Sequence, residues 1–172
     1  MIVLQNYAGG QYHPTNITCV FGFICFISIR YTAKYVNREN PVKLVVQIPW
    51  LNEEATLPLV LESIPTSIPG IDKIEILIID DGSTDRTIEV AKSHGVKHFV
   101  YHAGNRGLGI SFSDGVERAL ELGADIIVNT DGDNQYPQAR ISDLVQPIVE
   151  GRADIVIADR QTQKIAHFSP AK

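Results

Sequence analysis

Two aspartates one residue apart, Asp131 and Asp133, are the residues whose types and spacing best suit metal chemistry. They come shortly after the apolar, strand-like run at 126–128. Side chains at positions i and i+2 of a strand point the same way, so the two carboxylates can converge beyond the strand's end. Carboxylates that close repel each other unless a cation lies between them. A hard divalent cation fits, and Gln135 offers a third, neutral oxygen.

The same stretch also has an ordinary structural interpretation. Asp, Gly and Asn are common turn residues, so residues 131–134 could simply reverse the chain before Pro137 opens the next helical pattern. Spacing alone leaves both interpretations open, a metal site or a turn.

The elements that would position this stretch alternate between strand-like and helix-like patterns. Short β-branched runs predict strands, and apolar stripes at helical spacing predict helices between them. We expect strands at 43–48, 73–79, 96–101, 126–128 and 154–158, and helices at about 57–64, 84–92, 110–122 and 137–148. This alternation predicts an α/β fold with a Rossmann-like, mostly parallel sheet flanked by helices.

Polar clusters follow three of the predicted strands, at residues 49–54, 80–85 and 131–135. In open parallel sheets, ligands bind beyond the carboxyl ends of the strands. Because all three clusters fall at such ends, the sequence predicts a binding site along that edge of the sheet.

The cluster at 80–85 contains carboxylates that could accept hydrogen bonds from a nucleotide base or from ribose hydroxyls. Its ordinary interpretation is a turn followed by a helix that Ser83 or Thr84 caps. Both interpretations remain open on this cluster alone.

A glycine-rich stretch at 104–109 precedes a predicted helix and resembles a phosphate-cradling loop, in which Arg106 could pair with a diphosphate. It does not follow the first strand, as a dinucleotide-binding fingerprint would. Three histidines, His94, His98 and His102, have helical spacing, but Gly95 interrupts that pattern and we predict no metal role for them.

Composition limits the function classes. The chain of 172 residues fits one domain, and its net charge of −5 without a basic run argues against nucleic-acid binding. Its two cysteines form no zinc pattern, which favours a reducing compartment.

The N-terminal segment, residues 1–42, fits the rest of the chain poorly. Its apolar run at 17–29 has 13 residues, whereas a membrane-spanning helix needs about 20. Three interpretations stay open: an extension outside the native fold, a segment at a membrane interface, and an extra packing element. We predict that the functional domain is residues 43–172.

Residues 43–160 resemble the nucleotide-binding part of the family 2 glycosyltransferases, which have the GT-A fold. The resemblance is closest to the synthases of polyprenyl-phosphate and dolichol-phosphate sugars. Five motifs carry it in order and at matching spacing: IPWLNEE at 48–54, IIDDGSTD at 78–85, NRGLG at 105–109, DGDNQ at 131–135 and ADR at 158–160. The region of resemblance, 43–160, covers about two-thirds of the chain.

The resemblance implies a nucleotide base pocket lined by Pro49, Leu51 and Glu53, with Asp81 bonding the base. Leu51 replaces the aromatic residue often found at its position in the family, which would weaken stacking on the base.

The resemblance also implies a metal and diphosphate site. Asp131 would lie near the ribose and the metal, and Asp133 with Gln135 would hold Mg²⁺ or Mn²⁺ against the donor diphosphate. Arg160 matches the arginine that approaches this diphosphate, and Arg106 is a second candidate. The catalytic set implied in this way is Asp131, Asp133 and Arg160.

The implied activity is a metal-dependent, inverting transfer of a sugar from a UDP- or GDP-linked donor to a lipid phosphate or a glycan. A cytoplasmic protein is expected, and peripheral contact with the cytoplasmic face of a membrane is compatible with such an acceptor. The chain ends at Lys172, before the family's acceptor-binding part, so a catalytically silent nucleotide-binding fragment is an alternative. A sugar nucleotidyltransferase is another, although the first loop lacks the glycines and lysine that it would need.

Overall fold

The computed structural model describes residues 2–5, 24–27, 41–132 and 137–158. They form one seven-stranded sheet in the order β2-β7-β1-β6-β3-β4-β5. The strands are β1 (Ile2–Gln5), β2 (Ile24–Ile27), β3 (Lys43–Trp50), β4 (Lys73–Asp80), β5 (His98–Tyr101), β6 (Ile126–Asn129) and β7 (Ile155–Ala158). The helices are α1 (Leu57–Ser63), α2 (Thr87–Ser93), α3 (Leu108–Glu121), the short 3-10 helix η1 (Gln138–Arg140) and α4 (Ile141–Val149).

Four neighbouring strands, β6, β3, β4 and β5, are parallel to one another, as the alternating pattern predicted. Strand β3 continues two residues further than expected, through Pro49 to Trp50. Its pairing with β6 ends at Gln47, so the missing N–H of Pro49 removes no ladder bond from that side. The first polar loop therefore starts two residues later than the proline suggested.

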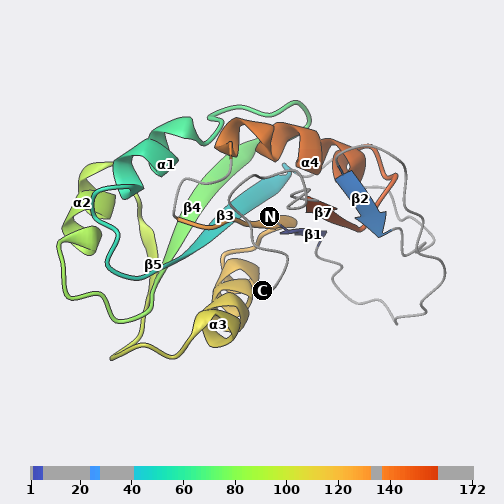
Figure 1. The fold of residues 1–172 in the computed structure, drawn as a ribbon. Coiled ribbons are helices and arrows are strands. Elements are labelled where there is room, and N and C mark those ends of the chain that lie inside the picture. Colours follow the sequence, from blue (N-terminus) through green and yellow to red (C-terminus); the bar gives the residue numbers. More distant parts are fainter. Residues whose placement is uncertain (1, 6–23, 28–40, 133–136, 159–172) are drawn as a thin grey trace, which may run out of the picture.

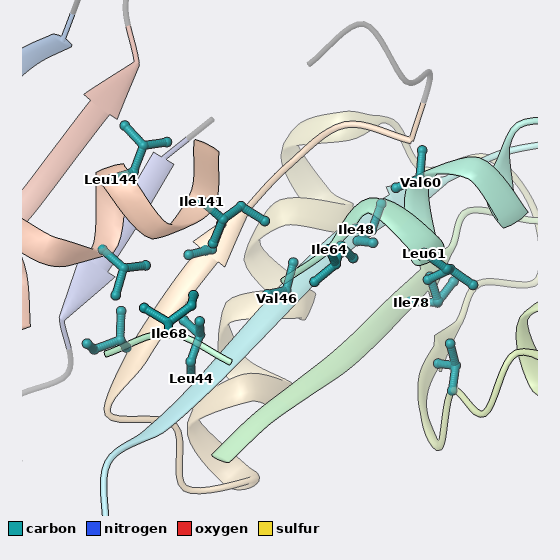
Figure 2. Close-up of a cluster of buried hydrophobic side chains, with 14 of the residues drawn as sticks. Leu44, Val46, Ile48, Val60, Leu61, Ile64, Ile68, Ile78, Ile141 and Leu144 are labelled. Atoms are coloured by element: carbon teal, nitrogen blue, oxygen red, sulfur yellow. The ribbon is translucent and has the colours of Figure 1, made fainter. Parts of the chain in front are cut away.

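Helices cover both faces of the sheet, with α1, α2 and α4 on one face and α3 on the other (Figure 1). Because successive strand side chains point to opposite faces, β3 sends Leu44, Val46 and Ile48 into the larger core and Val45 into the smaller one. Figure 2 shows the larger core, where these β3 side chains meet α1 and α4. Residues of β3 are buried on both faces, which explains their nearly continuous apolar sequence.

Two short strands come from the N-terminal segment. Strand β1 lies between β6 and β7 and is antiparallel to both, and β2 pairs antiparallel with the other side of β7. Among the described residues, no helix has both the length and the apolar character needed to cross a bilayer.

Candidate functional site

The carboxyl ends of β3, β4 and β6 bring the three polar clusters to one edge of the sheet. The amide of Asp81 donates to the carbonyl of Trp50 (2.9 Å), and the amide of Thr130 donates to the carbonyl of Gln47 (3.1 Å). On the far side, the amide of His102 donates to the carbonyl of Asp80 (2.9 Å). The loops after β4 and β6 therefore lie beside β3, and the loop after β5 lies beside β4.

Asn52 joins the first loop, between β3 and α1 (residues 51–56), to the second loop, between β4 and α2 (residues 81–86). Its amide donates to Oγ of Ser83 (3.0 Å), and its Oδ1 accepts from the amide of Thr84 (2.7 Å). Asn52 has a φ of 53°, a left-handed conformation that asparagine tolerates better than most residues. The predicted capping role of Ser83 or Thr84 is wrong, because α2 begins only at Thr87 and both side chains face the first loop.

Glu54 and Asp85 form a second, reciprocal connection between the same loops. Oδ2 of Asp85 accepts from the amide of Glu54 (3.1 Å), and Oε2 of Glu54 accepts from the amide of Arg86 (2.8 Å). Oδ1 of Asp85 also accepts from the amide of Thr87, at the first turn of α2. Burial alone would raise the pKa of Asp85, but the bonds from Thr87 and from the Glu54 amide outweigh it and lower this pKa.

Asp81 holds the glycine-rich loop against the second loop. Its carboxylate is buried and accepts from the amides of Arg106 (2.8 Å) and Gly107 (2.9 Å). Nδ1 of His102 lies 2.7 Å from the same carboxylate. Burial opposes ionisation here too, but these bonds lower the pKa of Asp81 below its usual value. Asp81 is therefore a fixed, ionised acceptor.

Gly82 makes the close contact between these two loops possible. It has a φ of +89°, and a Cβ there would lie 2.6 Å from the Cα of Gly104. Only glycine satisfies both the conformation and the space. Asp81 and Gly82 thus shape the start of the glycine-rich stretch.

His102 and Asp114 lie beside Asp81 at the border of the site, and the sequence did not predict them as site residues. Nε2 of His102 lies 3.0 Å from Oδ2 of Asp114 on α3, and the guanidinium of Arg106 donates to the same oxygen (2.8 Å). His102 is buried and connects Asp81 to α3. His102 directly follows β5, as Asp81 directly follows β4, and this position at a strand's carboxyl end could have predicted it as a site residue.

The predicted acidic turn, residues 131–135, begins directly after Thr130, which is buried. The hydroxyl of Thr130 donates to Oε1 of Gln138 (3.0 Å), so this bond joins a residue before the acidic turn to one after it. Asp131 is half-buried at the start of the turn, and Gly132 is buried. A Cβ on Gly132 would lie 2.8 Å from Cη2 of Trp50 and closer still to two other atoms of the same ring.

The predicted metal ligands are only partly within the described residues. Asp131 is described, whereas Asp133, Gln135 and also Arg160 lie outside the described residues. Within the described part of the chain, no group of three His, Cys, Asp or Glu residues is arranged to hold a metal ion. The donor set of two carboxylates and an amide oxygen still fits Mg²⁺ or Mn²⁺, which prefer oxygen ligands.

The predicted base-pocket residues lie at the end of β3 and in the first loop. Pro49 in β3 is half-buried, as are Leu51 and Glu53 between β3 and α1. Arg106 is exposed, and its guanidinium pairs with Asp114 in this structure. The structure thus brings the first loop, Asp81 and the start of the acidic turn to one edge of the sheet, as the polar clusters at the strand ends had predicted.

Comparison with known sequences agrees with this geometry. The sequence model of Glycosyl transferase family 2 matches residues 45–169. An uncharacterized protein of Methanocaldococcus jannaschii is 32% identical over 75% of this chain and 51% of its own length. A UDP-N-acetylglucosamine–dolichyl-phosphate N-acetylglucosaminyltransferase of Methanococcus voltae is 28% identical over 66% of this chain and 50% of its own length. A polyprenol monophosphomannose synthase of Mycolicibacterium smegmatis is 28% identical over 69% of this chain and 45% of its own length.

Among solved structures, glucosyl-3-phosphoglycerate synthase from Mycobacterium tuberculosis, in complex with Mn²⁺, UDP and glucosyl-3-phosphoglycerate, matches with a TM-score of 0.50. It is 31% identical, and the match covers 65% of this chain and 41% of the synthase. The chain spans about half the length of the curated relatives it matches. The predicted α/β, GT-A fold and the resemblance drawn from the five motifs are confirmed. The chain belongs to Glycosyl transferase family 2.

Proposed function

We propose that this chain carries the nucleotide-sugar site of a metal-dependent, inverting glycosyltransferase. The donor is a UDP- or GDP-linked sugar, and the acceptor is a lipid phosphate or a glycan. The observation that carries the proposal is the meeting of three loops at one sheet edge, with ionised Asp81 on one side and the Asp131–Gly132 turn on the other.

The first and second loops are the proposed base pocket. Pro49, Leu51 and Glu53 would line it, and Asp81 would accept a hydrogen bond from a base N–H. An ionised carboxylate only accepts, and the amides of Arg106 and Gly107 favour its ionised form. A pocket built in this way favours bases that present an N–H and disfavours those that do not.

The acidic turn is the proposed metal and diphosphate site. Asp131, Asp133 and Gln135 would hold Mg²⁺ or Mn²⁺, which supplies neutralisation of the charge that grows on the departing nucleoside diphosphate. Arg160 would add a cation there. Arg106 would have to leave Asp114 to reach the diphosphate. By fixing the donor, these residues let an acceptor oxygen approach the anomeric carbon in line with the leaving group, which inverts the configuration.

Two relatives support a lipid-phosphate acceptor, because their names state dolichyl phosphate and polyprenol as the molecules concerned. A phosphate acceptor is already anionic and needs little help from a general base, whereas a hydroxyl acceptor would require one. Such an acceptor would place the protein at the cytoplasmic face of a membrane.

Calorimetric titration tests the proposal. UDP and GDP are titrated into the protein with and without Mn²⁺, and release of UDP from UDP-sugars is then measured with polyprenyl phosphate present. We expect Mn²⁺ to raise nucleotide affinity at least tenfold. No nucleotide binding with Mn²⁺ would overturn the proposal.

A catalytically silent nucleotide-binding fragment is the second candidate. It predicts the same Mn²⁺-dependent binding without release of UDP from any UDP-sugar. The same experiment therefore separates the two candidates.

The domain boundary at residue 43 is also a proposal. The parallel strands β6, β3 and β4 carry the site loops, whereas β1 and β2 pair on the other side of β6. We expect deletion of residues 1–40 to lower the melting temperature, since β6 loses its β1 partner, but to leave Mn²⁺-dependent UDP affinity within threefold of the full chain. A larger loss of affinity would show that the N-terminal segment belongs to the binding unit.

A further inference from the structure

Trp50 is the last residue of β3, the only tryptophan of the chain, and 2% exposed. Its ring lies directly against the backbone of Gly132, the second residue of the acidic turn. Three ring atoms, Cζ3, Cε3 and Cη2, occupy the place of a Cβ on residue 132, and the farthest of them would be 2.8 Å from it. Heavy atoms of this kind do not approach closer than about 3.4 Å without repulsion.

The obstacle at position 132 is the ring and not the backbone. The φ of Gly132 lies outside the left-handed region, so an L residue could adopt its conformation. The ring has little freedom to move away, because it packs in the larger core and the Trp50 carbonyl accepts from the amide of Asp81. A methyl group at 132 would therefore displace the turn rather than the tryptophan.

The position of this contact matters because no ladder bond joins β3 to β6 there. Their register ends at Gln47 opposite Asn129, and the amide of Thr130 donates to the carbonyl of Gln47. Beyond that point, the Trp50 ring lies against Gly132, so the two chain segments remain in contact there.

We infer that Trp50 is a positioning residue that sets the distance between the base pocket and the metal-binding turn. This inference rests on the proposed function. The ribose and its 5′-oxygen limit how far apart the base and the diphosphate of a nucleotide can lie, so both subsites must keep a matching separation to be filled at once. Trp50 sets that separation, and glycine at 132 is the residue that fits against it.

The test is a cycle of three variants, Gly132→Ala, Trp50→Leu and the double variant. UDP affinity is measured by calorimetry with and without Mn²⁺. Gly132→Ala should lower Mn²⁺-dependent affinity at least tenfold and change Mn²⁺-free affinity less than threefold, since the base pocket is untouched. Trp50→Leu should lower the Mn²⁺-dependent affinity by about three- to tenfold. The double variant should recover at least fivefold relative to Gly132→Ala, because leucine leaves room for the methyl group.

Gly70→Ala is the matched control. A Cβ at Gly70 would lie 2.5 Å from Val149, but this glycine is at the amino end of β4, opposite the site. This variant should lose stability and keep its Mn²⁺-dependent UDP affinity. If circular dichroism shows that Gly132→Ala does not fold, Trp50→Leu alone tests the inference. Equal losses of UDP affinity with and without Mn²⁺ in Trp50→Leu would then overturn it.

Trp50 also provides a spectroscopic readout. Mn²⁺ is paramagnetic and quenches nearby fluorophores, whereas Mg²⁺ does not. With UDP present, Mn²⁺ should quench the fluorescence of this single tryptophan, and Mg²⁺ should not.

Failure of the inference and failure of the proposed function give different results. If the unmodified protein shows no Mn²⁺-dependent UDP binding, the proposed function fails. If it binds, but Gly132→Ala binds equally well or the double variant recovers nothing, only the inference about Trp50 is overturned.

Discussion

At the amino edge of the sheet, a partly buried negative charge is balanced by side-chain cations, whereas at the carboxyl edge a buried one is balanced mainly by backbone amides. Glu75 at the amino edge lies 2.7 Å from Nζ of Lys73 and 3.4 Å from both Lys43 and His98. Asp81 at the carboxyl edge accepts from two loop amides and contacts His102.

The difference separates a structural cluster from a functional one. A carboxylate surrounded by flexible cations can be replaced with little change in backbone shape. A carboxylate that holds amides of a loop determines the path of that loop. The carboxyl edge should therefore lose both stability and binding on mutation, and the amino edge stability alone.

The largest effect is expected for Asp81→Ala. It leaves the part-buried amides of Arg106 and Gly107 without their acceptor, which should cost about 3 kcal/mol of unfolding free energy. UDP affinity should fall at least tenfold both with and without Mn²⁺, since the base side is lost. Urea denaturation and calorimetry measure the two effects, and retained UDP affinity would show that Asp81 is not in the base pocket.

A smaller effect, on stability alone, is expected at Glu75. Burial would raise the pKa of Glu75, but Lys73, His98 and Lys43 lower it from 4.5 to about 2. A carboxylate whose pKa is lowered on folding stabilises the fold at every pH above its unfolded-state pKa. This stabilisation is lost as the pH falls from about 4.5 to about 2. Glu75→Gln should therefore cost about 2 kcal/mol at pH 7, and this difference should narrow towards pH 2.

Urea denaturation at pH 7, 4 and 2.5 measures this dependence, with exposed Glu117→Gln as the control. UDP affinity at pH 7 should be unchanged in both variants. A tenfold loss of UDP affinity in Glu75→Gln would end the distinction between the two edges.

The smallest effect is expected at Asn52, where the bond between its Oδ1 and the Thr84 amide is exposed to solvent. Asn52→Ala loses this bond and strains a φ of 53°, at a cost of about 1 kcal/mol. Asn52→Gly loses the bond but keeps the conformation, so its cost should be smaller. Thermal denaturation of the two variants separates the two contributions, and equal losses would show that the backbone conformation contributes nothing.

The sequence predicted the features that depend on local pattern. The order of strands and helices, the α/β fold and the three polar clusters at strand ends all follow from periodicity and turn residues between 43 and 158. The family followed from five short motifs at matching spacing, and the family match confirms it.

The features it missed depend on contacts between residues far apart in the chain. The sequence around Asp81 does not indicate that its carboxylate accepts from amides 25 and 26 residues later. The sequence around Ser83 predicts a helix cap, whereas in the fold Ser83 accepts from the amide of Asn52. The packing of Trp50 on Gly132 is likewise fixed by the β3–β6 pairing. Strands β1 and β2 are four residues each, too short to show a period.

One titration tests the central claim, that the acidic turn at the carboxyl edge coordinates a divalent cation that binds the nucleoside diphosphate. UDP is titrated with and without Mn²⁺ into the unmodified protein, into Asp133→Ala and into Asp143→Ala, whose aspartate pairs with Arg140 on the surface of α4. The account predicts that Mn²⁺ raises affinity at least tenfold in the unmodified protein and in Asp143→Ala, and not at all in a folded Asp133→Ala. An unchanged Mn²⁺ effect in Asp133→Ala would contradict it.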